Sequence, residues 1–248
     1  MMSLTETNVT SVAKNQYRFK SKIHSGMFFT LIAAQLLALI ISFNGVASSG
    51  GGSETITFTV RYISGDIIIG FTLIWAFVLG FNMAGSGFSQ DFTFVSNRLS
   101  SHLSSIAFLL TAAVIAGVTA TLGGILLRVL TVFTQSGLDY SGLHIPPLAL
   151  FSGIFAAILY ALLVSAGGYF FGMLVQQNRA FIVLLPGLLF GTLFMEARTT
   201  GQSQLLINTI EFFIKESSHS LFFLKVSLVA ALLFGLVILF SNRMEVRK

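Results

Sequence analysis

The chain has 248 residues, of which 54% are hydrophobic and 9% are charged, with a net charge of +5 and no cysteine. Soluble domains usually carry about a quarter charged residues, so this composition, with a mean hydropathy of +0.87, excludes an ordinary soluble protein and predicts an integral membrane protein. Without cysteine there is no disulfide and no thiol-based metal or redox site. The cations flank hydrophobic runs, so we expect them to meet anionic lipid headgroups and not nucleic acid.

The N-terminal segment, residues 1–24, is polar and basic and carries Tyr17 and Phe19 close to the first hydrophobic run. This pattern is typical of a short interfacial helix that rests on the inner leaflet. The first span follows at about residues 25–43. Its apolar core is longer than the roughly 7–15 residues of a signal peptide, so we interpret it as a retained span despite the cleavage-like sequence Val46-Ala47-Ser48.

Five more hydrophobic runs follow, and no long soluble region separates them. Pro146-Pro147 opens one run, and proline is tolerated in the first turn of a helix. Pro186-Gly187 lies inside a shorter run and predicts a kinked or broken helix. The sequence therefore predicts an all-α integral membrane protein with six transmembrane helices in a single transmembrane domain over residues 1–248. The remaining spans are expected at about residues 62–84, 104–128, 148–172, 180–195 and 221–240.

Six spans place both termini on one side of the membrane. The positive-inside rule assigns the side richer in Lys and Arg to the cytoplasm. Nine of the 14 cations fall on the terminal side, so the N and C termini are predicted to be cytoplasmic. These nine are Lys14, Arg18, Lys20, Lys22, Arg98, Arg179, Arg243, Arg247 and Lys248, and the five on the other side are Arg61, Arg128, Arg198, Lys215 and Lys225.

Two loops on the outer side have patterns of their own. The loop after the first span is rich in glycine and serine from Ser48 to Ser53. The loop between the fifth and sixth spans places Leu206, Ile210 and Phe213 at helical spacing, which predicts a short helix at the outer surface.

The stretch from Gly85 to Ser105 is a polar interruption between the second and third spans. Its apolar residues recur at spacings of three and four, so on a helix they form one face, which we expect to meet lipid, while polar residues point to the cytosol. Phe94 lies off that face, and an exposed aromatic among charges suits a partner's pocket. The stretch is predicted to be an amphipathic helix that either docks a partner or only anchors the loop. The apolar face consists of Phe88, Phe92, Val95, Leu99 and Leu103, and the polar residues are Asp91, Ser96, Asn97, Arg98 and His102.

The motifs do not support chemistry within this chain. ATP hydrolysis needs Gly-x-x-x-x-Gly-Lys-Ser/Thr, and the chain has no Gly-Lys pair. A serine protease needs a serine and a histidine at membrane depth, but all four histidines fall in loops or at span ends. The spans contain neither His-Glu-x-x-His nor clustered carboxylates to bind a metal. We therefore expect no enzyme, no catalytic residue, no metal site and no cofactor bound by this chain.

Polar residues inside the spans have two interpretations. Asp66, one turn inside the second span, marks either an ion pathway or an interfacial carboxylate at the helix start. Uncharged polar residues suit a substrate path, and they equally suit hydrogen bonds between helices. The path candidates are Asn82, Thr111, Thr119, Tyr160 and Tyr169.

Small residues spaced by four predict close helix packing, because they let two backbones approach. They occur as Gly80/Ala84, Ala113/Gly117/Thr121, Gly168/Gly172 and Gly187/Gly191.

This layout resembles the membrane subunit of an ABC-2-type transporter. The shared features are a basic N-terminus, six spans with cytoplasmic ends, a polar helix between spans two and three, and a broken fifth span followed by a small outer helix. At the residue level, Phe94-Val-Ser-Asn-Arg-Leu-Ser-Ser101 is similar to the Ser- and Arg-containing segment of such permeases. It differs in having Asn97 before a single basic residue.

The resemblance implies that the polar stretch is a coupling helix, which docks on a separate ABC ATPase subunit that binds ATP and Mg²⁺. It also implies that two permease subunits pair, as a homodimer or heterodimer, around the path. The expected role is a multi-pass permease of the bacterial plasma membrane, exporting a lipid-like, peptide or antibiotic-like molecule. By position, the coupling residues would be Asp91, Phe94, Ser96, Asn97 and Arg98.

Two other functions remain open. A membrane interaction or assembly protein without transport would use the same stretch to recruit a regulator. A secondary transporter built of 3+3 inverted repeats would carry discontinuous helices in matching positions of both halves. Pro186-Gly187 has no clear counterpart in the first three spans. This argues against a secondary transporter and favours the ABC permease or the interaction protein.

Overall fold

The computed structural model describes residues 9–43, 47–53, 56–62, 65–90, 98–134, 146–200, 208, 212 and 218–243. These ranges contain seven longer helices and two strands. In chain order they are α1 (Val9–Ile23), α2 (Gly26–Phe43), β1 (Ala47–Ser53), β2 (Ile56–Tyr62), α3 (Asp66–Gln90), α4 (Arg98–Thr134), α5 (Pro147–Gln177), α6 (Phe181–Thr200) and α8 (His219–Arg243).

Five of these helices, α2, α3, α4, α5 and α8, are long and apolar enough to cross a membrane. A shorter apolar helix covers Phe181–Glu196 of α6. The prediction of a multi-pass helical membrane protein is therefore confirmed, with five spans of the expected length and a sixth candidate that is shorter.

Each predicted span overlaps one helix, and the largest difference concerns the third. α4 has 37 residues and extends beyond the predicted 104–128 at both ends. No proline or glycine lies in these extensions, so nothing interrupts the helical hydrogen bonds. At about 1.5 Å per residue α4 is about 55 Å long, well over the roughly 30 Å of a bilayer core. Its ends therefore extend beyond the hydrocarbon.

α3 and α5 pack against each other and run parallel along the bundle. Phe77 of α3 lies at Gly168 of α5, and Ala84, further along α3, lies at Gly172, further along α5. Two parallel helices cannot follow each other directly through a membrane, and α4 provides the return between them.

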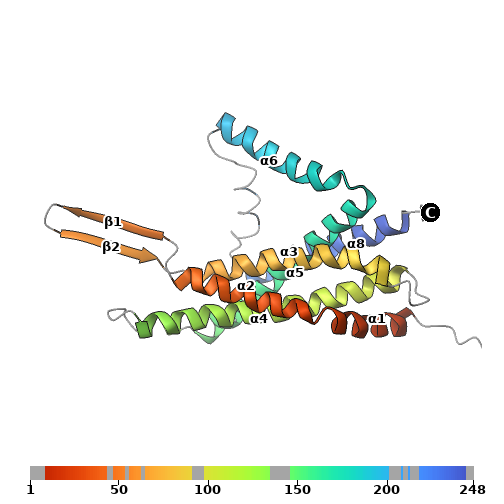
Figure 1. Ribbon diagram of the computed structural model, residues 1–248, viewed down its shortest axis with the longest axis horizontal. Helices are drawn as coiled ribbons and strands as arrows, with labels where there is room; N and C mark the ends of the chain where they lie inside the picture. The colour runs from red at the N-terminus through yellow and green to blue at the C-terminus, as the bar shows by residue number, and fades with distance from the viewer. Residues whose placement is uncertain are drawn as a thin grey trace, which may run out of the picture.

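α5 and α8 also run parallel. The ring centroids of Phe155 and Phe223 are 5.3 Å apart, and those of Phe170 and Phe240 are 6.3 Å apart. The chain between the two helices therefore returns from one end of the bundle to the other, and α6 lies in this segment. In Figure 1, α6 points away from the remaining helices.

The two ends of the bundle differ in what they carry. Figure 1 shows α1, the start of α4 and the C-terminal end of α8 at one end, with the β1–β2 hairpin at the other. α1 continues almost in line with α2 and lies along α4. The predicted helix in the plane of the inner leaflet is therefore replaced by one that extends the bundle.

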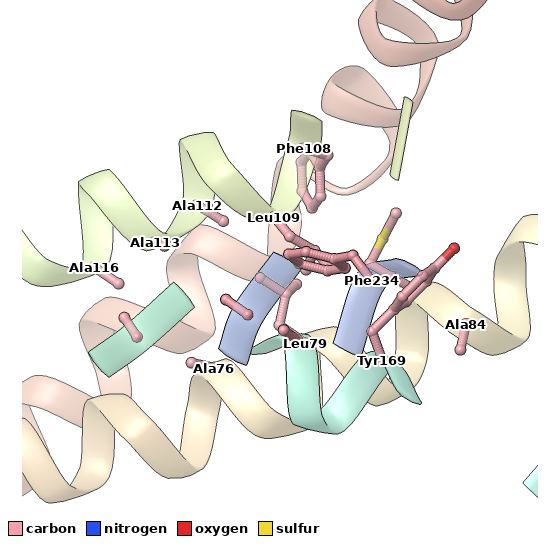
Figure 2. Close-up of a cluster of buried hydrophobic side chains, with 14 of the residues drawn as sticks. Ala76, Leu79, Ala84, Phe108, Leu109, Ala112, Ala113, Ala116, Tyr169 and Phe234 are labelled. Atoms are coloured by element: carbon pink, nitrogen blue, oxygen red, sulfur yellow. The ribbon is translucent and has the colours of Figure 1, made fainter. Parts of the chain in front are cut away.

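The core lies where α3, α4, α5 and α8 meet, and Figure 2 shows side chains from these helices in one cluster. Phe108 and Leu109 of α4 are buried there beside Tyr169 of α5. Alanines lie among these large side chains at the contacts between helices, and α4 contributes three of them. The buried alanines are Ala112, Ala113 and Ala116.

The predicted small-residue contacts are confirmed in three of the four sets. A Cβ atom on Gly80 would collide with the backbone of Ser165, and one on Gly168 with the carbonyl of Phe77. Gly117 likewise lies against the backbone of Ile158. The fourth set is not used in the described structure, because a Cβ atom at either glycine of α6 would meet nothing within 4 Å; these glycines are Gly187 and Gly191.

Three outer features differ from expectation or lie outside the described residues. The Gly/Ser-rich segment expected as a loop forms β1, which pairs antiparallel with β2 from Ala47↔Tyr62 to Ser53↔Ile56. Glycine does not prevent backbone pairing, and β2 supplies the β-branched and aromatic residues that favour a strand. α6 continues through Pro186 without a break. The predicted outer helix at Leu206, Ile210 and Phe213 lies outside the described residues.

The contact between α3 and α5 predicts opposite effects for two neighbouring glycines. Gly168→Ala introduces a methyl group against the backbone of Phe77 and should lower the free energy of unfolding by about 1–3 kcal/mol. Gly167→Ala is the matched control, since nothing lies within 4 Å of its Cβ position and alanine favours a helix. Thermal unfolding of the detergent-solubilised protein measures both. Equal stability of the two variants would contradict the close contact.

Candidate functional site

The polar stretch from Gly85 to Ser105 is divided between two helices. Residues up to Gln90 continue α3, and Arg98 begins α4. The expectation of a separate helix over the whole stretch is therefore wrong at both ends, because the hydrogen-bond ladders of α3 and α4 extend into it. The candidate coupling residues Asp91, Phe94, Ser96 and Asn97 lie outside the described residues, and Arg98 is placed only as the first residue of α4.

At the start of α4, the apolar residues lie on the outer face, as their spacing predicts. Leu99 and Leu103 are 39% and 41% exposed, on the outer face of the helix. His102, however, was expected to point to the cytosol and is buried at 5% exposure. The prediction for His102 is wrong because α4 has protein, not water, on that side.

Lys20 connects α1 to this part of α4. Its side chain is 2% exposed. The Nζ atom donates to the carbonyl oxygen of Ser101 at 3.1 Å and to the hydroxyls of Ser104 at 2.9 Å and Ser105 at 2.8 Å. A buried ammonium group is costly unless hydrogen bonds satisfy it, and here several oxygen atoms do so. We call this arrangement the Lys20 clamp.

The Lys20 clamp belongs to a polar face of α1 that packs on α4. Gln16, Lys20 and His24 are spaced by four, so they lie on one side of the helix, and all three are buried. The Nδ1 atom of His24 lies 3.0 Å from the carbonyl oxygen of Lys20, and its ring packs 5.7 Å from Phe108. The side-chain amide of Gln16 has no hydrogen-bond partner among the described residues. The contact between α1 and α4 is thus polar toward the end of the bundle and becomes apolar toward its centre, where His24 meets Phe108.

His102 connects α4 to α5 at the same level. Its Nδ1 atom lies 2.8 Å from the hydroxyl of Tyr169, which is itself 3% exposed. The ring of Phe234 from α8 packs 6.2 Å from Tyr169. The start of α4 is therefore attached to α1 through Lys20 and to α5 through His102.

The sequence does not predict the contacts of these connecting residues. The spacing of Gln16, Lys20 and His24 by four is a signal for one face of α1, and the polar sequence Ser-Ser-His-Leu-Ser-Ser at residues 100–105 is a signal for its partner. A lysine next to a membrane span is usually expected to contact lipid headgroups. The sequence alone therefore does not show that Lys20 is a buried hydrogen-bond donor.

A second polar network lies deeper in the bundle. The amide nitrogen of Gln35 in α2 donates to the hydroxyls of Thr72 in α3, at 3.1 Å, and Thr119 in α4, at 3.0 Å. The indole nitrogen of Trp75 donates to the hydroxyl of Thr30 at 3.0 Å. Polar side chains in a membrane need partners within the protein, so this network fixes α2 on α3 and α4.

The path candidates have different surroundings. Thr119 belongs to the Gln35 network and Tyr169 to the His102 contact, so both serve helix packing. Thr111 donates to the carbonyl oxygen of Phe108, and Tyr160 packs on Phe222 with ring centroids 5.2 Å apart. Asn82 is exposed on α3. Spread over three helices, the five are not brought together at one place.

Asp66 is the first residue of α3 and is exposed. A carboxylate at a helix N-terminus is stabilised by the helix dipole, which agrees with the interfacial interpretation. Within the described ranges, no group of three or more His, Cys, Asp or Glu side chains is arranged to hold a metal ion.

No family model, curated protein or solved structure matches the chain. The fold and the described helices define a multi-pass helical membrane protein.

The Lys20 clamp predicts that removing its serine acceptors costs more stability than removing the lysine itself. Ser104→Ala with Ser105→Ala removes two acceptors from a buried ammonium group, and this should lower the free energy of unfolding by about 1.5–3 kcal/mol. Lys20→Met should cost less, because the serine hydroxyls can turn to carbonyl oxygens of their own helix, as Ser104 already does with Ser101. Adding Lys20→Met to the serine variant should therefore restore stability.

Thermal unfolding and tryptic cleavage within α1 measure this cycle. Lys22→Met serves as the control, since Lys22 is exposed on the same helix. Additive losses in the combined variant would contradict the buried clamp.

Proposed function

We propose that this chain is the membrane subunit of an ATP-driven ABC transporter, in which a separate ATPase acts on the end of the bundle that carries α1. The sequence resemblance to ABC-2-type permeases is one support. The second is the geometry: α5 and α8 run parallel, which requires a return between them. We assign that return to α6 as a sixth crossing. Both termini then lie on the cation-rich side, which is the cytosol by the positive-inside rule.

The contacts of α4 support a route by which an ATPase would act on the bundle. The segment between Gln90 and Arg98 connects α3 to α4, and the first turns of α4 are attached to α1 and α5. A force on this segment would therefore move three helices together. In this proposal the ATPase contacts Asp91, Phe94, Ser96, Asn97 and Arg98.

The cargo we propose is a lipid-like, peptide or antibiotic-like molecule, exported across a bacterial plasma membrane. The path would form between two permease subunits. This arrangement suits a chain whose polar residues at membrane depth hydrogen-bond within its own bundle, as Gln35 and Thr119 do. ATP and Mg²⁺ would be bound by the partner subunit.

A second candidate is a membrane interaction protein without transport. The packing roles of Thr119 and Tyr169 are equally compatible with this candidate, since it needs no substrate path. A neighbouring gene that encodes Gly-x-x-x-x-Gly-Lys-Ser/Thr and an ABC signature would favour the transporter.

The coupling proposal predicts that Phe94→Ala with Arg98→Ala strongly weakens ATPase docking without affecting membrane insertion. Loss of two anchor residues should weaken binding by about thirtyfold or more, since such anchors contribute about 2 kcal/mol or more. Co-purification with the ATPase and stimulation of its ATP turnover measure this. The matched control is Arg179→Ala with Phe181→Ala, a cation and an aromatic at the turn between α5 and α6. Unchanged docking and transport in the first variant would reject the assignment.

The sixth crossing predicts that the two ends of α6 lie on opposite sides of the membrane. The chain has no cysteine, so single cysteines can be labelled without further changes. Gln177→Cys at the end of α5 and Asn208→Cys beyond α6 are both exposed. A membrane-impermeant maleimide added to intact cells should label only Asn208→Cys, and added to inside-out vesicles only Gln177→Cys. Labelling of both from one side would show that α6 does not cross.

A further inference from the structure

The exposed side of α1 carries a row of cations that the packing on α4 leaves outside the bundle. Lys14, Arg18 and Lys22 are spaced by four residues, so they lie on one face of the helix, and all three are exposed. Their Cα atoms follow one another at about 6 Å along the helix axis. α1 contains no acidic residue. We call these three residues the basic row of α1.

α1 reaches beyond the lipid headgroups. α2 has 18 residues, or about 27 Å, which covers most of the roughly 30 Å of the hydrocarbon core. α1 continues almost in line with α2 (Figure 1), so Arg18 lies about 12 Å and Lys14 about 18 Å beyond Gly26, the first residue of α2. The headgroup region adds about 5–8 Å on each side of the hydrocarbon. Arg18 and Lys14 therefore lie past the headgroups that we expected them to meet, and only Lys22 lies at their depth.

The side chains around the basic row change with this depth. Phe19 and Ile23, on the half of α1 closer to the membrane, are 36% and 47% exposed. Between Thr10 and Arg18, no large hydrophobic side chain of α1 is exposed. A helix that rests on lipid exposes apolar side chains along its length. The outer half of α1 instead has the surface of a helix that meets water or a polar protein.

The Lys20 clamp holds the basic row in one orientation. Lys20 donates to Ser104 and Ser105 of α4, and Gln16 and His24, one turn to either side of Lys20, are buried with it. A turn of α1 about its axis would take the buried ammonium group away from these oxygen atoms, which is costly. The basic row is therefore a rigid surface whose charges keep a spacing of one helical turn.

The neighbouring charges at this end of the bundle have the same sign among the residues that the structure describes. Arg98 begins α4, Arg179 follows α5 and Arg243 ends α8, and these helix ends lie at the end of the bundle that carries α1. The described carboxylates, Asp66 and Glu196, lie at the start of α3 and in the second half of α6. The complement to the basic row is therefore an acidic surface on another molecule.

We propose that the basic row of α1 docks a soluble protein through an acidic helix. Carboxylates at every fourth residue of a helix are about 6 Å apart, which matches the spacing of the row. A helix beside α1 pairs all three cations at once, whereas a disordered acidic chain must first be ordered.

Exposed ion pairs contribute little affinity each, so this contact speeds and orients the encounter more than it tightens the complex. The inference depends on the charges, the orientation and the depth of α1. It does not require that the partner is an ATPase.

The test uses two stapled helical peptides of identical composition as probes. One carries three glutamates at every fourth residue, on one face, and its isomer carries the same three glutamates spread around the helix. Binding to the full-length protein in nanodiscs of phosphatidylcholine, a zwitterionic lipid, is measured by biolayer interferometry at low salt. The one-face peptide should bind about fivefold more tightly, because its isomer forms only one ion pair at a time. Addition of about 0.5 M NaCl should remove the difference, since salt screens exposed charges.

Variants of the protein assign the binding to the row. Lys14→Gln with Arg18→Gln should lower the affinity for the one-face peptide about fivefold and abolish its preference over the isomer. Lys22→Gln should lower this affinity about twofold at most. The matched control, Arg128→Gln with Arg198→Gln, removes two exposed cations outside α1 and should leave both affinities unchanged. Thermal unfolding verifies the fold of each variant, and if the double α1 variant does not fold, its two single variants replace it, each with an expected loss of about twofold.

Three results would overturn the proposal. The first is equal binding of the two peptides by the wild type, which would show that the charges of α1 have no fixed pattern. The second is an unchanged affinity in the Lys14 and Arg18 variant, which would place the peptide elsewhere. The third is a larger loss for Lys22→Gln than for Lys14→Gln, which would place the contact at headgroup depth and assign the row to lipid.

Discussion

The close approach of α3 and α5 is the constraint on which the rest of the bundle depends. Inside a membrane the hydrophobic effect does not drive helices together, so association relies on packing and on hydrogen bonds. Gly80, Gly168 and Gly172 let the two backbones touch, and any larger side chain there would separate them. α4 and α8 then complete the core around Tyr169, Phe108 and Phe234. α3 and α5 thus form the centre on which α4 and α8 pack.

Hydrogen bonds add specificity at two depths. In the membrane, Gln35 joins three helices through two threonine hydroxyls. At the end of the bundle, Lys20 and His102 join α1, α4 and α5. Both arrangements satisfy polar groups that would otherwise be costly to bury. They also mean that the first turns of α4 cannot move independently of α1 and α5.

Much of the fold was predictable from the sequence. Long hydrophobic runs indicate membrane-spanning helices, and small residues at spacings of four indicate close contacts between helices. The contacts of Gly80, Gly117 and Gly168 are examples. The site was less predictable. Lys20 and Lys22 look alike in sequence, and only the position of α4 makes one buried and the other exposed. His102 was misplaced for the same reason. The strand Ala47–Ser53 forms because it pairs antiparallel with β2, and a run of glycine and serine alone does not predict a strand.

The parallel packing of α3 and α5 has a consequence for biosynthesis. When α3 enters the membrane, the surface of Gly80 has no partner, because α5 has not yet been made. α4 must be inserted in the opposite direction before Gly168 and Gly172 can reach it. The central contact of the bundle therefore closes late, and until then α3 depends on lipid or on the insertion machinery to cover its glycine surface. The order of synthesis thus delays the tightest contact until four of the five long helices are present.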